Sequence, residues 1–429
     1  MSGSDRSETG LPETSGTDHA TGMSRRAVLG GTATLALGMA MAKDAAAAQT
    51  KAPGKSRLLY ICSYTGKTGN GPGITLARLD GDKGRLEIIK SFAGPNPSWL
   101  AFAPDGAHAY AVNEIEDFAG KGGGGGKQGS VTAYSVDRET GDLTVLNTVG
   151  SGGTGPAYCS VHPGGRHVLV ANYGGGQVAV LPIAADGSLQ AATDVQAPQG
   201  PTGPTTAAAA PPGSFAFSGH DASHAHMIEA DPQARFVLST DLGQDRTYVW
   251  TLDPEAGKLH PADPAFFPAA STGSGPRHFA FHPNGRVLYT VYEEASQLAV
   301  HSYDPATGHA ALLQQTGTLP PGFAGSSFAS ALAISRDGRF LYAGNRLHNS
   351  TAIFAIEPDG KVRWLDAEWT RGDYPNQIAL DPTGHFLFAC NRRSDQVTLF
   401  HVDPHSGKLA FTGQYLPVGS PNMVVFPPA

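Results

Sequence analysis

The sequence of 429 residues has few charged side chains, few cysteines and, after residue 50, no long stretch with the apolar period of a helix. Charged residues make up only 16% of the chain, and beyond the N-terminal region its lysines and arginines form no cluster. With a net charge of -7, this composition argues against nucleic acid as a partner. The weak helical signal, combined with many glycines and prolines, favours short strands joined by turns.

Several kinds of chemistry also lack their usual sequence patterns. The three cysteines, Cys62, Cys159 and Cys390, lie far apart in apolar runs, so we expect small buried core residues rather than disulfides or a metal site. Neither GxSxG nor HExxH occurs, which leaves a serine-hydrolase or zincin mechanism without support. The glycine run at residues 120–126 does not fit the phosphate-loop pattern, and we interpret it as a flexible linker. The sequence therefore predicts no cofactor.

The N-terminal region has the pattern of a targeting segment. Residues 1–22 are polar, and they are followed by two arginines, an apolar run from Ala27 to Ala42 and small residues that end near Ala48. This order is typical of a twin-arginine export signal, and the apolar run is short for a stable membrane anchor, which is the alternative. We expect residues 1–48 to be read by the twin-arginine export machinery. Residues 49–429 then form one domain of an extracellular or periplasmic protein.

A repeat is present in the rest of the chain. Six segments share a strand, a tight turn rich in Pro, Asp and Gly, and a second strand that ends in a polar pair. These segments are residues 96–114, 155–173, 225–242, 275–293, 328–346 and 374–392. Most are followed by a third strand and a further hairpin turn, so each unit contains about four strands.

A seventh unit is divided between the two ends of the domain. Residues 420–428 match a first strand, and residues 56–64 match a second strand. The halves complete one unit only if the chain closes into a ring. The sequence therefore predicts an all-β seven-bladed β-propeller with four-stranded antiparallel blades, closed by pairing of its N- and C-terminal strands. An open solenoid is the alternative, but its ends would carry polar capping units.

The turns also fix which residues lie at one mouth of the central channel, because the first strand of each blade lines the axis. We call the residue six positions before the turn proline, or its equivalent, the first slot. The two residues seven and eight positions after the turn glycine, or its equivalent, form the second slot. The first slot holds Ser98, Ala157, His226, Arg277, Ser330, Asn376 and Asn422. The second slot holds Ser63-Tyr64, Asn113-Glu114, Asn172-Tyr173, Asp241-Leu242, Tyr292-Glu293, Asn345-Arg346 and Asn391-Arg392.

Polar residues at strand ends can simply meet solvent, and this explains the serines and asparagines of the two slots well. The combination of His226, Arg277, Glu293 and Arg346 is different, because it brings acid/base and cationic groups to one place, as catalysis requires. Glu294 lies one residue beyond the second slot, and we expect it to be a solvated loop carboxylate.

From Leu58 to Phe426 the chain resembles the lactonase family of seven-bladed propellers, which includes the propeller-type 6-phosphogluconolactonases and the fungal carboxymuconate cyclases. The resemblance rests on the DLGQDR stretch, on the paired PRH and VYE of residues 275–293, and on the HAH that contains His226. It implies a site made of one histidine, one glutamate and two arginines. The matching positions are His226, Glu293, Arg277 and Arg346. Residues 196–221 depart from the family pattern as an insertion, called here the inserted segment.

These observations predict an exported, monomeric hydrolase that opens a sugar or acid lactone, or a related carboxylate, at the channel mouth. Glu293 or His226 serves as general base, and Arg277 and Arg346 stabilise the oxyanion or hold an anionic substituent. Further substrate contacts are expected from Glu114, His224, His278, Asn345, Asn376 and Asn391. The alternatives are a lactone-forming cyclase of the carboxymuconate type, a non-catalytic ligand-binding propeller, and a metal held by His224 and His226.

Overall fold

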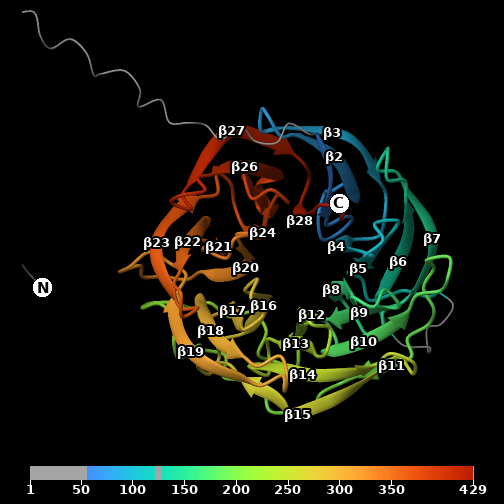
Figure 1. Cartoon of the computed structure of the whole chain (residues 1–429), viewed down its shortest axis with the longest axis horizontal. Coiled ribbons are helices and arrows are strands. Elements are labelled where there is room, and N and C mark those ends of the chain that lie inside the picture. Colours follow the sequence, from blue (N-terminus) through green and yellow to red (C-terminus); the bar gives the residue numbers. More distant parts are fainter. Residues whose placement is uncertain (1–55, 121–126, 429) are drawn as a thin grey trace, which may run out of the picture. The chain divides into compact units, whose positions relative to one another are not determined.

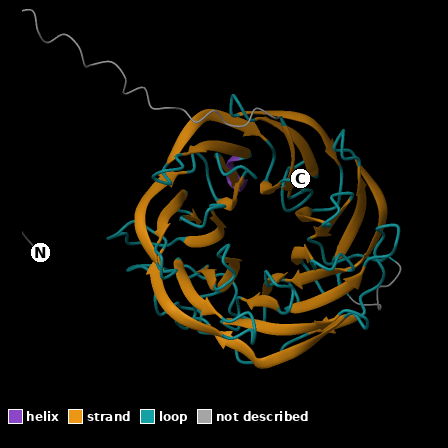
Figure 2. Cartoon of the chain, viewed as in Figure 1, coloured by secondary structure: helices purple, strands orange, loops and turns teal. Residues whose placement is uncertain are grey.

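The computed structural model describes residues 56–120 and 127–428. The predicted export signal and most of the glycine run lie outside the described residues. The described chain folds into seven four-stranded antiparallel sheets arranged around a central axis (Figure 1, Figure 2), which confirms the predicted seven-bladed β-propeller. Within these residues the one helical element is a 3-10 turn, η1 (Arg392–Ser394), and no helix is long and apolar enough to cross a membrane.

Blades 1 to 4 are described first, each from the axis outward. Blade 1 contains β28 (Pro421–Val425), β1 (Arg57–Ser63), β2 (Ile74–Asp80) and β3 (Arg85–Phe92). Blade 2 contains β4 (Pro97–Phe102), β5 (His108–Asn113), β6 (Ser130–Val136) and β7 (Leu143–Gly150). Blade 3 contains β8 (Pro156–Val161), β9 (His167–Asn172), β10 (Gln177–Pro182) and β11 (Asp194–Gln196). Blade 4 contains β12 (Ala225–Ala230), β13 (Val237–Asp241), β14 (Arg246–Asp253) and β15 (Lys258–Pro268).

The remaining three blades follow the same order. Blade 5 contains β16 (Pro276–Phe281), β17 (Val287–Tyr292), β18 (Gln297–Tyr303) and β19 (Ala310–Gly317). Blade 6 contains β20 (Phe328–Ile334), β21 (Phe340–Arg346), β22 (Ser350–Ile356) and β23 (Val362–Trp369). Blade 7 contains β24 (Pro375–Leu380), β25 (Phe386–Asn391), β26 (Gln396–Val402) and β27 (Leu409–Pro417).

Blade 1 closes the ring as the divided seventh unit predicts. The C-terminal strand β28 pairs antiparallel with β1, and Ile61 lies opposite Val424. The closure leaves no blade with an unpaired inner strand, so the two ends of the domain stabilise each other.

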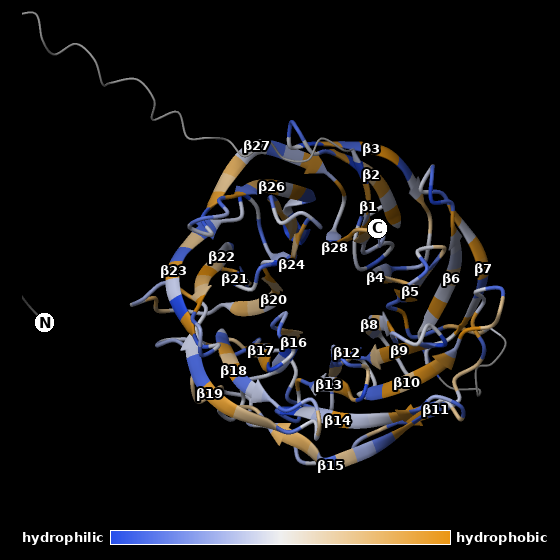
Figure 3. Cartoon of the chain, viewed as in Figure 1, coloured by the Kyte–Doolittle hydropathy of each residue, from blue (hydrophilic) through white to orange (hydrophobic). Residues whose placement is uncertain are grey.

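The core lies between neighbouring blades, where apolar side chains of the middle strands pack. Figure 3 shows hydrophobic residues concentrated along the strands, while many of the connecting loops are hydrophilic. The three cysteines are buried and free, as predicted. Four tyrosines of the second strands also bond to the next blade. Each donates its hydroxyl to a turn glycine carbonyl there: Tyr60 to Gly141, Tyr110 to Gly187, Tyr289 to Gly360 and Tyr342 to Gly407.

A β-bulge interrupts the innermost strand of every blade at the first slot. In β16, for example, Pro276 pairs with Tyr292 and His278 pairs with Val291, so Arg277 between them has no partner on β17. The same irregularity falls at Ser98, Ala157, His226, Ser330, Asn376 and Asn422. Because a bulge redirects a side chain and frees backbone groups from the ladder, it aims the first-slot residues at one end of the axis.

Candidate active site

A cavity of about 150 Å³ receives residues from all seven blades, which places it on the axis of the ring. Eleven of its lining residues belong to the two predicted slots, namely Tyr64, Glu114, Ala157, Tyr173, His226, Arg277, Glu293, Arg346, Asn376, Arg392 and Asn422. The other three are Trp99, His278 and Tyr374. The structure therefore brings the four residues implied by the family resemblance together in one cavity, called here the axial cavity.

Glu293 forms the centre of a buried ionic cluster in this cavity. Its Oε2 lies 2.9 Å from Nε of Arg277 and 2.5 Å from Nη2 of Arg346. Burial alone would raise the pKa of Glu293, but the two guanidiniums outweigh burial and hold its pKa below the ordinary value. Glu293 is therefore ionised at neutral pH. Two cations and one anion leave this cluster with one unbalanced positive charge.

The two arginines are held in place by backbone carbonyls of β20, which belongs to the next blade for Arg277 and to its own blade for Arg346. Arg277 donates to the carbonyl of Ser330, and Nη2 of Arg346 donates to the carbonyl of Ala329 at 3.1 Å. Both acceptors lie at the bulge of β20, where the ladder is interrupted. The carbonyls hold the two guanidiniums in position, and because a carbonyl is neutral, the positive charges are not neutralised by these contacts.

His226 offers a proton acceptor beside this cluster. The side chain is buried, it lines the axial cavity, and its Nδ1 has no hydrogen-bond partner within the described residues. Burial and the positive charges of Arg277 and Arg346 hold the pKa of His226 well below its ordinary value. The imidazole is therefore neutral at pH 7 and can accept a proton.

Glu114 lies in the part of the cavity formed by blades 1 and 2. The hydroxyl of Tyr64 donates to its Oε2 at 3.0 Å, and the guanidinium of Arg392 lies 3.8 Å from the centre of the Tyr64 ring. Burial raises the pKa of Glu114. The hydrogen bond from Tyr64 and the positive charges of Arg392 and Arg277 oppose that rise.

Two other expected substrate contacts also line the cavity. Asn376 donates from Nδ2 to Oδ1 of Asn422 at 2.8 Å, and its own Oδ1 is unpartnered within the described chain. His278 follows the bulged Arg277 and touches the axial cavity and a deeper one of about 160 Å³. It therefore forms part of the wall between the two.

Three expected substrate contacts, Asn345, Asn391 and His224, do not line the axial cavity. Asn345 donates to the carbonyl of Thr318 at 2.6 Å, and Asn391 donates to the carbonyl of Thr370 at 3.1 Å, so each binds the segment that follows the outermost strand of the preceding blade. In the second-slot pairs only the second residue reaches the axial cavity, in every blade except the one with Leu242, and no first residue lines it. We therefore revise the expectation that these two asparagines bind substrate.

His224 also lies behind the cavity wall. Its ring stacks on Tyr173 with centroids 4.5 Å apart, and its two nitrogens contact the carbonyl of Tyr173 at 2.8 Å and Oδ1 of Asp221 at 3.0 Å. Because both nitrogens are engaged, His224 does not share a ligand position with His226. Across residues 56–120 and 127–428, no group of three or more His, Cys, Asp or Glu side chains is arranged to hold a metal ion.

The expectation for Glu294 is wrong. Its side chain is completely buried, and its Oε1 accepts hydrogen bonds from the hydroxyl of Ser218 and from the backbone N–H of Gly219 at 3.1 Å. Both donors come from the inserted segment, which lies about 75 residues earlier in the chain. The local pattern of blade 5 carries no trace of this contact, so a count from the turn could not find it.

Trp99 and Tyr374 were missed because neither occupies a slot: Trp99 lies one residue after Ser98, and Tyr374 lies two residues before Asn376. Trp99 directly follows the bulged Ser98, and a bulge turns two successive residues toward the same side. Tyr374 precedes β24 with a positive φ of 62° and stacks under the guanidinium of Arg393 at 3.8 Å. An aromatic residue directly after a first-slot position was the available signal for Trp99.

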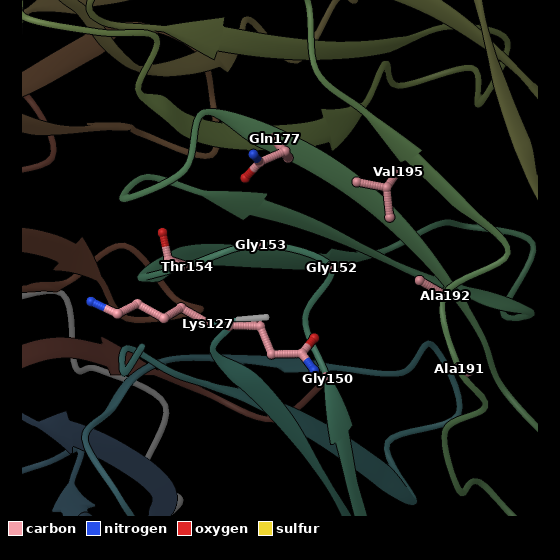
Figure 4. Close-up of a pocket in the computed structure, with 10 residues that line it drawn as sticks. Lys127, Gly150, Gly152, Gly153, Thr154, Gln177, Ala191, Ala192 and Val195 are labelled. Atoms are coloured by element: carbon pink, nitrogen blue, oxygen red, sulfur yellow. The ribbon is translucent and has the colours of Figure 1, made fainter. Parts of the chain in front are cut away.

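A second cavity, of about 380 Å³, lies between blades 2 and 3 (Figure 4). Its polar side chains are Lys127, Gln128, Thr154 and Gln177, and the rest of the lining is glycine, alanine and valine. It contains no carboxylate or histidine beside the single lysine, so it offers no acid/base pair. The axial cavity is therefore the candidate active site.

Comparison with known proteins agrees with this fold. Residues 58–426 match the family described as "Lactonase, 7-bladed beta-propeller". The 6-phosphogluconolactonase of Bacillus subtilis is 31% identical over 321 residues, which cover 74% of this chain and 83% of that protein. The structure of the periplasmic gluconolactonase PpgL of Pseudomonas aeruginosa superimposes with a TM-score of 0.76 and 33% identity, covering 87% of this chain and 99% of PpgL. A putative 6-phosphogluconolactonase of Bacteroides fragilis gives a TM-score of 0.76 at 27% identity, covering 86% of this chain and 98% of that one.

Proposed function

Because the chain belongs to the lactonase family of seven-bladed β-propellers, we propose that it is a lactone hydrolase that opens a sugar lactone in the axial cavity. The observation that carries the proposal is a neutral, unpartnered imidazole beside a buried cluster with one unbalanced positive charge. This pair of features matches the two needs of lactone hydrolysis, a base for water and a cation for the oxyanion.

In the proposed reaction His226 accepts a proton from water as the water oxygen bonds to the lactone carbonyl carbon. The carbonyl oxygen becomes an oxyanion next to Arg277 and Arg346. Collapse of this intermediate breaks the bond between the carbonyl carbon and the ring oxygen, and the imidazolium returns its proton to that oxygen. The product is a hydroxy acid, whose carboxyl group loses its proton to solvent.

Between the two bases considered from the sequence, the geometry favours His226. Oε2 of Glu293 is engaged by two guanidiniums, whereas Nδ1 of His226 has no partner among the described residues and remains free to accept a proton. Its proposed role is to keep Arg277 and Arg346 close together despite their mutual repulsion. Glu114, with its raised pKa, is placed to hydrogen-bond a substrate hydroxyl.

Export through the twin-arginine pathway is part of the proposal. It is supported by the N-terminal pattern and by the periplasmic origin stated for PpgL. Replacing Arg25 and Arg26 together by lysine should keep the precursor in the cytoplasm, because the export machinery recognises the arginine pair. Fractionation of cells that express the double variant tests this, and unchanged secretion would contradict it.

The activity is tested with a panel of plain sugar lactones, phosphorylated sugar lactones and dicarboxylate lactones, monitored by proton release. Turnover of a sugar lactone is the expected result, and preference within the panel identifies the substituents that the cavity accepts. Turnover of dicarboxylate lactones alone would point to the cyclase-type reaction instead. Binding without turnover of any member would overturn the hydrolase proposal in favour of a ligand-binding propeller.

A further inference from the structure

The inserted segment contacts the propeller through a buried histidine, His220, that lies between two carboxylates. None of these three residues belongs to a slot. Nε2 of His220 lies 3.3 Å from Oδ1 of Asp245, and its Nδ1 lies 3.5 Å from Oε1 of Glu294. The side chains of His220 and Glu294 are completely buried, and that of Asp245 is nearly so. We call these three residues the histidine tie.

Both carboxylates of the tie are attached to the hairpin that carries Arg277 and Glu293. Asp245, in the turn between β13 and β14, accepts the backbone N–H groups of Gly273 at 2.5 Å and Gly275 at 3.0 Å, just before β16 begins. Glu294 directly follows Glu293 at the end of β17. The two ends of this hairpin also bond to each other, because the N–H of Glu293 donates to the carbonyl of Gly275 at 2.7 Å.

The packing at this point leaves no free space. Gly275 has a positive φ of 71°, and a Cβ built there would lie 1.7 Å from Oε2 of Glu294. A shift of the Glu294 carboxylate would therefore move the backbone two residues before Arg277. Ser218 of the same segment contacts Glu294 and also helps to lower the pKa of Glu293.

We propose that His220 is a positioning residue for the proposed lactonase reaction, because its tie to Asp245 and Glu294 fixes the hairpin ends that carry Arg277 and Glu293. This inference rests on the proposed function for its effect on turnover, but the positioning itself is independent of what the cavity binds. His220 does not line the axial cavity, so it acts through the hairpin and not on the substrate.

The charge of His220 is essential to the tie. Burial lowers the pKa of His220, but the contacts with Asp245 and Glu294 outweigh burial and raise the pKa to about 9. The exposed Asp221, next in the chain, is the other acidic group that interacts with it. A pKa raised above the unfolded value stabilises the fold fully below about pH 6.5, and this contribution is lost as the pH rises through about 9. Loss of the proton leaves two buried carboxylates without their cation.

The first experiment compares purified wild type with His220→Gln, which keeps hydrogen-bonding groups but cannot carry the charge. At pH 7 we expect kcat to fall about 10-fold with little change in KM, since Arg277, which Glu293 holds in place, acts on the transition state. Wild-type kcat, corrected for uncatalysed opening, should decline between pH 8 and 9, below the range in which Arg277, whose pKa burial lowers to about 10, loses its proton, and the variant should lack that decline. A decline that persists in His220→Gln, or an unchanged kcat at pH 7, would overturn the proposal.

Hydrogen exchange provides a readout that does not depend on activity. In His220→Gln the amide of Glu293, which closes the hairpin ends, should exchange about 10-fold faster than in wild type. His301→Gln is the matched control, because His301 is also buried, contacts the Phe267 ring and has no carboxylate partner in the described chain. It should change neither kcat nor this exchange rate.

Two further results separate the possible failures. If no lactone is turned over but exchange at Glu293 still responds to His220→Gln, the proposed function fails and the positioning holds. If His220→Gln does not fold, wild-type exchange at Glu293 measured at pH 7 and 9.5 decides the question. A rate that rises no faster than that of amides in blade 2, after correction for pH, would overturn the tie.

Discussion

Glu293 and Glu294 are neighbours in the sequence and both are buried, yet they belong to two clusters with opposite charge balance. Glu293 contacts two guanidiniums in the axial cavity. Glu294 lies near one histidine and accepts hydrogen bonds from Ser218 and Gly219, outside that cavity. The first cluster contains two cations and one anion, whereas the histidine tie contains one cation and two anions.

The difference shows how each cluster is used. Surplus positive charge that faces a cavity is available to an oxyanion, so the Glu293 cluster is suited to chemistry. In the histidine tie the carboxylates of Glu294 and Asp245 accept backbone N–H groups of Gly219, Gly273 and Gly275, and none of the three tie residues lines the axial cavity. The tie is suited to fixing the backbone. The following predictions test this division of roles.

The largest effect is expected for Glu293→Gln. Removing this charge leaves two adjacent buried guanidiniums without their anion, which costs about 3–5 kcal/mol of folding free energy for a buried pair. We expect kcat/KM to fall by about 10²-fold or more and the melting temperature to drop. Steady-state kinetics and thermal unfolding measure the two effects. Wild-type kinetics in this variant would contradict the role given to the cluster.

A smaller effect is expected for Arg277→Lys, which keeps the positive charge and loses the planar fork. The guanidinium contacts Glu293 and the carbonyl of Ser330 at the same time, and an ammonium group cannot reproduce both contacts in one plane. We expect kcat/KM to fall about 10-fold with little change in melting temperature. Full activity would show that charge alone is sufficient at this position.

Glu294→Gln tests the histidine tie by changing one of its two carboxylates. It removes one of the two partners of His220 and keeps an acceptor for Ser218 and Gly219, so kcat should fall about 5-fold. In the double variant with His220→Gln the losses should not add, because both changes remove the same contact. Additive losses would show that the two residues act independently.

The smallest effect on activity is expected for Asn345→Ala. This side chain is buried and donates to the carbonyl of Thr318, so its loss should lower stability by about 1–3 kcal/mol. Because Asn345 does not line the axial cavity, kcat/KM should stay within about 2-fold of wild type. A large loss of activity at unchanged stability would return Asn345 to the site.

The sequence was sufficient for the ring and for most of the axial cavity, because both follow from short-range rules. The turn position sets the strand register, and the register sets which residues face the axis, so His226, Arg277, Glu293 and Arg346 could be selected by counting. The asparagines of the second slot were misjudged, since the count cannot separate the last residue of a strand from the one that turns inward. The surroundings of Glu294 depend on contacts with an insertion without a repeat, and no local pattern encodes such contacts.

The central claim is that the neutral imidazole of His226 accepts the proton of the attacking water beside the arginine pair. It is tested most directly by kcat for the best lactone of the panel, measured for wild type and for His226→Gln with folding checked by circular dichroism. We predict a loss of about 10²-fold at pH 7 and a wild-type kcat that stays level from pH 8 to pH 6, because the pKa of His226 lies well below its ordinary value. Equal turnover by the folded variant would contradict the account.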